Sequence, residues 1–292
     1  MMNKIYTILI AVLSFSSSAY AQSPAQNLMP DGSHDMYLGV GVMSRPIYEG
    51  AERNKRVVIP VMQMQWSNGV FLSGMNAGWH LSNQFNHEFG PLISLEPNRT
   101  SSGTSNSIHT PSNISSGIVG PLGGDSFDFR IDNRSKNKLV GLNEIRTRLL
   151  YGGFYNLQIS SNLRQTNTIL FGAGNQQNGI RLSSDLRYRF KDVLPHHQFT
   201  VGIGVTFMNQ AYAQTYFGVT ELESSRSVNE VYTPSAGLKN IHADFFWNWN
   251  LNSSWLVTTK MNISQFANSR KKSPLVERNN NLTISTAIAY RF

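Results

Sequence analysis

The side chains in this sequence that could do chemistry are mostly basic, and they recur at alternate positions. In the stretch IRLSSDLRYRF (180–190), Arg181, Asp185, Arg187 and Arg189 fall on one face of an extended chain. The same face of comparable stretches carries further charged residues, namely Arg146, Arg148, Arg164, Lys260 and Arg291, with Glu144 and Asp244. If this face lines an aqueous interior, its charge would attract small anionic solutes. If the interior is packed instead, the arginines would pair with carboxylates and backbone carbonyl groups, and both interpretations stay open.

Nucleophilic or metal chemistry has weaker support in the sequence. The seven histidines are scattered, and no spacing with serine or aspartate places a base beside a nucleophile on one identifiable edge. A barrel enzyme that modifies lipid or lipopolysaccharide would have to use His109 or His196. The glycine-rich stretch GAGNQQNG (172–179) precedes no helix, so it indicates a turn and not a nucleotide site. We therefore expect a protein that is not an enzyme, with no catalytic residue, no metal and no cofactor.

The elements that must position the basic residues are long strands. The last residues, NNLTISTAIAYRF, alternate between an apolar or aromatic set and a small or polar set. The stretch KNIHADFFWNWNL (239–251) alternates in the same way, with Phe246 as the one apolar residue on its polar face. Such stretches match the roughly 9–11 residues that a tilted strand needs to cross a bilayer. Their aromatic residues lie toward the ends, as in the girdles of membrane barrels. The predicted fold class is all-β, an antiparallel transmembrane β-barrel.

We expect about twelve strands, an even number as is usual for these barrels. They are placed near residues 36–43, 57–66, 70–79, 87–96, 144–155, 157–166, 178–190, 196–209, 212–219, 239–250, 254–265 and 281–292. A closed barrel must pair its last strand with its first, and the terminal Phe292 resembles the signal that barrel-assembly machinery reads. The short links 67–69 and 252–254 indicate periplasmic turns, whereas 223–237 and 267–280 indicate outside loops.

Residues 97–143 do not follow this pattern. They are rich in serine, asparagine and glycine and have no sustained period. By the parity of the predicted strands they would lie on the periplasmic side, as a long loop or as a segment that plugs the lumen. A strand missed within them is the alternative.

The N-terminus predicts export. Residues 1–21 hold one basic residue, an apolar run and an A-x-A pattern that ends at Ala21, which is typical of a cleaved signal peptide. The chain has no cysteine, 14% charged residues and a mean hydropathy of −0.27. Beyond residue 21 it has no apolar run long enough for a transmembrane helix. We therefore expect residues 22–292 to form a single barrel domain in the outer membrane of a Gram-negative envelope.

The basic stretch SRKKSP (269–274) could suggest a nucleic-acid partner. In an outside loop, Arg270, Lys271 and Lys272 would more simply contact the phosphate groups of outer-membrane lipids and lipopolysaccharide. We therefore expect no nucleic acid among the partners. The sequence does not set an oligomeric state.

Several stretches resemble a known family. GVGVMSRPIYEGAERNKRVVIPVMQMQWSNGVFLS (39–73) resembles the opening of the MipA/OmpV family, with its glycine-rich first strand, Pro-x-Tyr-x-Gly turn and Ile-Pro second strand. AYAQTYFGVT (211–220), YTPSAGLKNI (232–241), KSPLVE (272–277) and the terminal YRF resemble its C-terminal half in order and spacing. The resemblance covers most of the chain beyond the signal peptide, apart from 97–143.

The resemblance implies an outer-membrane barrel and supplies no catalytic motif. Members are described as scaffolds that bring a murein-cleaving lytic transglycosylase together with a penicillin-binding protein, and others as porin-like or adhesion-related proteins. A non-enzymatic scaffold that contacts such enzymes from its periplasmic face is therefore the first hypothesis. A narrow porin-like channel with a basic lumen is the alternative, and a barrel enzyme that modifies lipid or lipopolysaccharide is the second alternative. A shared fold does not decide between them.

Overall fold

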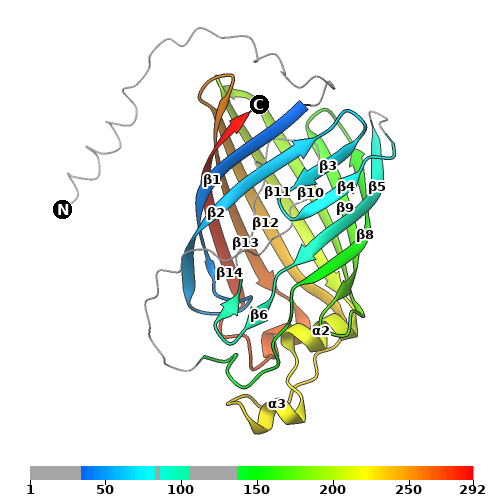
Figure 1. The fold of residues 1–292 in the computed structure, drawn as a ribbon, viewed down its shortest axis with the longest axis vertical. Helices are drawn as coiled ribbons and strands as arrows, with labels where there is room; N and C mark the ends of the chain where they lie inside the picture. Colours follow the sequence, from blue (N-terminus) through cyan, green and yellow to red (C-terminus); the bar gives the residue numbers. More distant parts are fainter. Residues whose placement is uncertain (1–33, 83–85, 106–136, 292) are drawn as a thin grey trace, which may run out of the picture.

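The computed structural model describes residues 34–82, 86–105 and 137–291, which form a closed antiparallel barrel (Figure 1). Twelve strands make the wall: β1 (His34–Pro46), β2 (Asn54–Gln65), β3 (Val70–Ser73), β4 (Asn76–Trp79), β5 (His87–Glu96), β8 (Arg148–Gln158), β9 (Leu163–Ala173), β10 (Gly179–Leu194), β11 (His197–Met208), β12 (Gly237–Asn250), β13 (Trp255–Phe266) and β14 (Asn280–Arg291). The remaining elements are the ribbon β6 (Arg99–Thr100) and β7 (Gly103–Thr104), the helices α2 (Gln210–Phe217) and α3 (Glu221–Ser225), and the 3-10 turn η1 (Asn268–Lys272). Within the described ranges, no helix is long and apolar enough to cross a membrane. The predicted fold class is confirmed, and the predicted signal peptide lies outside the described residues.

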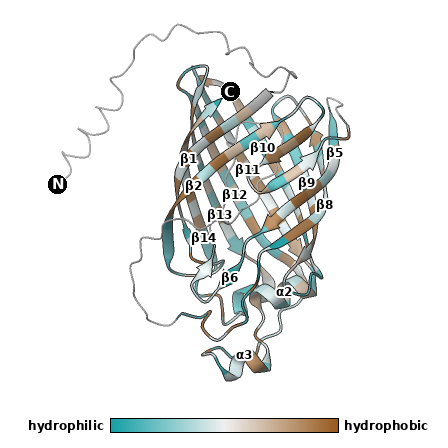
Figure 2. Ribbon diagram, viewed as in Figure 1, coloured by the Kyte–Doolittle hydropathy of each residue, from teal (hydrophilic) through white to brown (hydrophobic). Residues whose placement is uncertain are grey.

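The wall follows the alternation expected from the sequence. On β12, Ile241, Phe245 and Trp249 point outward, with 53%, 37% and 39% of their surface exposed. Asp244 and Asn248 on the same strand are buried toward the lumen. Figure 2 shows hydrophobic and hydrophilic residues alternating along the strands. An apolar outer band around a polar interior is the arrangement that a bilayer requires, because every strand is paired and no polar face meets lipid.

The barrel closes between its first and last strands, as predicted. β1 and β14 pair from Tyr37 opposite Arg291 to Ser44 opposite Ile284. A Cβ atom on Gly39 of β1 would lie only 2.2 Å from the carbonyl oxygen of Ile288, so this junction admits no side chain there. The glycine-rich first strand is therefore a requirement of closure.

The single strand predicted at 70–79 is wrong, because it is the hairpin β3–β4. Gly74 adopts a left-handed φ of 57° and reverses the chain there. The extra strand reverses the direction of β5. β5 therefore ends at the end of the barrel opposite the start of β1 and the end of β14, beside the loops that hold α2 and η1 (Figure 1). In outer-membrane barrels the short turns are periplasmic and the long loops extracellular. The expected periplasmic position of 97–143 is therefore corrected: both flanks of this segment lie at the extracellular end, and 106–136 lie outside the described residues.

The strand predicted at 212–219 is also wrong, because this segment forms α2. The Asn209 side chain accepts a hydrogen bond from the Tyr212 N–H at 2.9 Å and caps the helix. Tyr212 and Tyr216 then stack one turn apart, with ring centroids separated by 4.4 Å. Because one strand is lost here and one is gained at β3–β4, the predicted number of strands remains correct.

Candidate functional site: a polar cavity in the lumen

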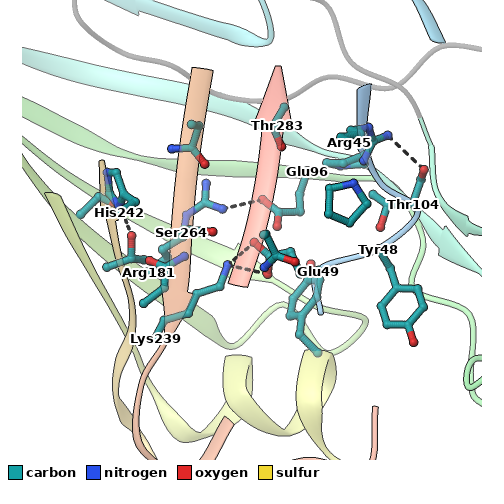
Figure 3. Close-up of a pocket in the computed structure, with 18 of the residues that line it drawn as sticks. Arg45, Tyr48, Glu49, Glu96, Thr104, Arg181, Lys239, His242, Ser264 and Thr283 are labelled. Carbon is teal, nitrogen blue, oxygen red and sulfur yellow. Dashed lines mark hydrogen bonds and ion pairs between the residues drawn. The ribbon is translucent and has the colours of Figure 1, made fainter. Parts of the chain in front are cut away.

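A cavity of about 380 Å³ lies in the extracellular half of the lumen (Figure 3). Most of its wall comes from β9 to β14 and the end of β1. Tyr212, Tyr216 and Phe217 of α2 close its outer side. The site is therefore a chamber between the barrel wall and a helix folded into the barrel mouth.

An apolar patch of the lumen wall holds α2 in place. The inner faces of β5 and β8 contribute Leu92, Leu150 and Phe154, and that of β9 contributes Leu170, to one buried cluster with Tyr212 and Phe217 of the helix. Removing this much apolar surface from water favours the docked helix, at roughly 25 cal/mol for each square ångström. The helix is thus a packed part of the barrel.

The opposite wall is charged, and two glycines shape it. Gly202 and Gly204 are lumen-facing residues of β11, between β10 and β12. Because Gly204 has no side chain, Asp185 of β10 reaches His242 of β12 across it, with Asp185 Oδ1 and His242 Nε2 2.7 Å apart. A Cβ atom on Gly204 would lie 2.4 Å from that nitrogen. The glycines therefore form a notch where side chains of two non-adjacent strands meet.

A second carboxylate lies beside this pair. Asp244 Oδ1 accepts a hydrogen bond from Asn262 Nδ2 at 2.9 Å and lies 3.8 Å from Lys260 Nζ. Ligand atoms of Asp185, His242 and Asp244 lie within 4.8 Å of one another, close enough for a divalent cation. Because the Lys260 ammonium group lies next to Asp244, we interpret this group as a mixed-charge wall that offers both acceptor oxygens and a cation to the cavity.

Phe246, the apolar residue on the polar face of β12, is buried in the lumen. The guanidinium carbon of Arg187 lies 5.3 Å from its ring centre, and Lys260 Nζ lies 5.2 Å from it. Aromatic faces attract cations at such distances. The ring therefore helps to place two cations in the lumen.

A hydrogen-bonded network joins the wall to α2 (Figure 3). Arg181 Nη1 lies 3.3 Å from Glu96 Oε2, and the Tyr212 hydroxyl donates to the other oxygen of Glu96 at 3.4 Å. Lys239 Nζ lies 2.8 Å from Glu49 and donates to the Tyr212 hydroxyl at 3.3 Å. Burial and the Glu96 carboxylate raise the pKa of Tyr212 well above its ordinary value, so the hydroxyl stays protonated and can donate.

The cavity carries a surplus of positive charge. Six cationic side chains line it (Arg45, Arg99, Arg181, Arg187, Lys239 and Lys260) against four carboxylates (Glu49, Glu96, Asp185 and Asp244). In a narrow chamber with low-dielectric walls such a surplus attracts anions.

The predicted lumen residues fall into three groups. Arg181, Asp185, Arg187, Asp244 and Lys260 line the cavity. Arg164, Arg189 and Arg291 lie nearer the periplasmic end, where Arg164 Nη2 lies 2.6 Å from Glu88 Oε2 and the Arg291 guanidinium carbon lies 5.8 Å from the Tyr37 ring centre. Arg148 lies at the extracellular rim and donates to the Asn175 carbonyl oxygen at 3.3 Å.

Three other charged residues lie elsewhere than predicted. Arg146 precedes β8 and is exposed, as is Glu144, because this strand begins at residue 148 and the alternation does not extend further back. Arg146 is therefore not a lumen residue. Arg270, expected to contact the outer leaflet, is fully buried and donates to the Gly237 carbonyl oxygen at 3.0 Å.

The cavity also contains charged residues that the sequence did not identify: Arg45, Glu49, Glu96, Arg99 and Lys239. Arg45 is in phase with the lumen-facing Met43 of β1, so a longer first strand would have identified it. Lys239 lies next to an irregularity in the β11–β12 pairing, where strict alternation fails. Glu49 follows β1 and Arg99 lies in the two-residue strand β6 beyond the end of β5, so only the folded loops bring them to the lumen.

The histidines proposed for an enzyme are not part of this site. His196 is exposed in the periplasmic turn between β10 and β11, with a left-handed φ of 64°. His109 lies outside the described residues. The described part of the chain thus gives the enzyme alternative no additional support.

Residues 38–292 match the family described as MltA-interacting protein MipA, whereas no curated protein sequence matches the chain. Among solved structures, the KdgM porin is 10% identical over 88% of this chain and 99% of its own, with a TM-score of 0.42. The NanC porin is 7% identical over 88% of this chain and 100% of its own, with a TM-score of 0.44. A Pseudomonas aeruginosa FadL homologue is 7% identical over 88% of this chain and 89% of its own, with a TM-score of 0.36. Because these structural likenesses are low, the family match carries the assignment: the chain belongs to the MipA family and is an outer-membrane β-barrel protein.

Proposed function

We propose that this barrel binds small anionic solutes in its lumen and lets them pass across the outer membrane. The observation that supports this function is the surplus of cationic over carboxylate side chains in the lumen cavity. Rings of basic side chains select anions in pores, because the field of the wall replaces part of the hydration that the anion loses. The arginines nearer the periplasmic end, Arg164, Arg189 and Arg291, extend the same field along the lumen.

The solute must be small. A barrel of twelve strands lies between the small barrels that side chains fill and the wide porins. The helix α2 narrows the extracellular mouth further. Single-channel conductance should therefore be low compared with that of wide porins.

Planar-bilayer recording of the purified protein tests this function. We expect measurable conductance that prefers anions, and a weaker preference when Arg181, Arg187 and Arg189 are changed together to glutamine. Arg278→Gln is the matched control, since this arginine is exposed in an extracellular loop. Currents that are absent, or unchanged in the triple variant, would remove the channel function.

The scaffold is the second candidate, and the family description favours it. A protein of a family described as MltA-interacting is expected to contact a partner enzyme. The scaffold hypothesis takes the partners to be a lytic transglycosylase and a penicillin-binding protein. The periplasmic end is the surface for such a contact, and Leu81, Ile159 and Leu194 are exposed there by 54%, 51% and 51%. Exposed apolar groups of this kind are common at contact surfaces.

Crosslinking in intact cells, followed by capture and mass spectrometry, tests the scaffold. Changing Leu81, Ile159 and Leu194 to serine should reduce recovery of both murein enzymes. A control at the extracellular end, with Leu222, Val228 and Val231 changed to serine, should not reduce it. Recovery of assembly machinery alone would contradict the scaffold.

Lipid contact is proposed for the extracellular rim. Lys271 and Lys272 of η1 are exposed there, within reach of the phosphate groups of lipopolysaccharide and lipids. Changing both to glutamine should lower the amount of lipopolysaccharide that co-purifies with the barrel, and an unchanged amount would contradict this contact.

A further inference from the structure

The uncharged part of the cavity lining contains more hydroxyl and amide groups than the passage of simple anions requires. Between the charged groups, the inner faces of β11 to β14 present hydroxyl and amide side chains: Thr206, Asn240, Asn262, Ser264, Thr283 and Ser285. A simple inorganic anion needs only positive charge, whereas closely spaced hydroxyl and amide groups match a ligand with several hydroxyl groups.

Asn240 and Tyr216, which both line the cavity, each carry a polar atom without a hydrogen-bond partner among the described residues. The Asn240 residue is only 9% exposed, and its Oδ1 atom has no hydrogen-bond partner among the described residues. The Tyr216 hydroxyl, on the α2 side of the cavity, has none either. Leaving a buried polar group unpaired destabilises a protein, so each such atom needs an explanation. Both residues line the chamber, so a small rotation of each side chain would bring these buried atoms to the hydroxyl groups of a bound ligand.

The charged groups limit the ligand further. Arg187 and Lys260 flank Phe246 on one side of the notch, and the carboxylates of Asp185 and Asp244 lie next to them. A cation pair suits one acidic group of a ligand, while carboxylate oxygens accept hydrogen bonds from its hydroxyl groups. The volume of about 380 Å³ lies within the range of small-molecule sites.

We infer that the cavity is a binding site for an acidic sugar of roughly one or two rings. The acidic group pairs with Arg187 and Lys260, and the ring hydroxyl groups bond to Asn240, Asn262 and the Tyr216 hydroxyl. This inference rests on the proposed passage of anions and names the class of solute. A carboxylate and a phosphate share the required chemistry, and the sugar carboxylate is the form to which we commit.

Calorimetry on the full-length folded barrel tests the inference, in a zwitterionic detergent because sugar-headed detergents would compete. The probes are D-glucuronate, D-glucose, acetate and glucose 6-phosphate. We expect glucuronate to bind at least about tenfold more tightly than glucose, which lacks the acid, or acetate, which lacks the hydroxyl groups. Equal binding of acetate would indicate an anion site only, and equal binding of glucose would indicate no role for the cations. Tighter binding of glucose 6-phosphate than of glucuronate would overturn the choice of the carboxylate.

Variants locate the site. Tyr216→Phe removes one hydroxyl group and should weaken glucuronate binding several-fold, and Lys260→Gln should lower it to the level of glucose. Asn178→Leu, an exposed residue between β9 and β10, is the control and should change nothing. Unchanged affinity in both cavity variants, while each runs as a folded barrel on unheated gels, would overturn the inference.

Conductance separates this inference from the proposed function. Glucuronate binding without anion current would support the sugar site and contradict passage. Anion current without preference for glucuronate over acetate would support passage and contradict the sugar site.

Discussion

The two sides of the lumen wall differ although their outer faces are alike. The inner faces of β5, β8 and β9 carry Leu92, Phe154 and Leu170, which pack against α2. The inner faces of β10, β12 and β13 carry charged groups such as Arg187, Asp244 and Lys260. Since lipid imposes the same apolar requirement on every outward face, only the inward residues are free to differ. The difference indicates that one wall supports the helix and the other forms the site.

The largest expected effect is a loss of stability when a residue of the apolar wall is changed. The Phe154 ring centre lies 5.6 Å from that of Phe71 and 5.1 Å from that of His80, so Phe154→Ala would leave a cavity in packed surroundings. We expect a loss of about 3–5 kcal/mol in the free energy of unfolding, measured by urea denaturation of the folded barrel. Asn262→Ala on the charged wall loses one hydrogen bond and should cost only about 0.5–1.5 kcal/mol. Equal losses would contradict the division between the walls.

A smaller effect is expected at the β11 notch. In Gly204→Ala the new methyl group would meet His242 Nε2 at 2.4 Å and Asp185 Oδ1 at 2.7 Å, so both side chains must move apart. We expect a loss of about 1–3 kcal/mol in unfolding free energy, by the same denaturation. Gly153→Ala on β8 is the matched control, because its closest contact, the Gly90 carbonyl oxygen, would be at 3.2 Å. A control variant as unstable as Gly204→Ala would show that the notch has no special role.

The anchor of α2 can be tested through conductance. Arg99 donates to the carbonyl oxygens of Tyr216 at 2.7 Å and Thr215 at 3.3 Å, in the last turn of the helix. Arg99→Gln should loosen α2 and raise single-channel conductance, roughly two-fold if the helix limits the bore. Arg226→Gln, which removes a bond to Gly141 in the extracellular loops, should leave conductance unchanged. A lower or constant conductance in Arg99→Gln would contradict a narrowing role for α2.

The smallest expected effect is a loss of hydrogen-exchange protection in the extracellular loops at low pH. Burial alone would raise the pKa of Glu223. Hydrogen bonds from the N–H groups of Thr220 and Asn143 outweigh burial and hold this pKa below its ordinary value of 4.5. The stabilisation is therefore present above that value and is lost as the pH falls through the lowered pKa. Hydrogen exchange at Asn143, corrected for its intrinsic pH dependence, should show loss of protection only below about pH 4.5. Glu223→Gln should remove this pH dependence, and persistence of the transition would assign it to another group.

The strands of the wall could be predicted because apolar and polar residues alternate along them, as on β12, and the apolar set marks the outward face. The sequence did not allow α2 to be predicted, since Tyr212, Gln214 and Tyr216 also alternate, and only the Asn209 cap and packing inside the barrel favour a helix. The charged face of β10 was identified in advance. The pairing of Asp185 with His242 was not, because it depends on strand register and on a glycine in the intervening strand.

The preference of the lumen for anions is the central claim, and the reversal potential of the wild-type protein under a potassium chloride gradient measures it most directly. The surplus of cations in the cavity predicts a reversal potential displaced toward that of chloride. A potential displaced toward that of potassium would contradict it, as would the absence of current from protein shown to be folded and inserted.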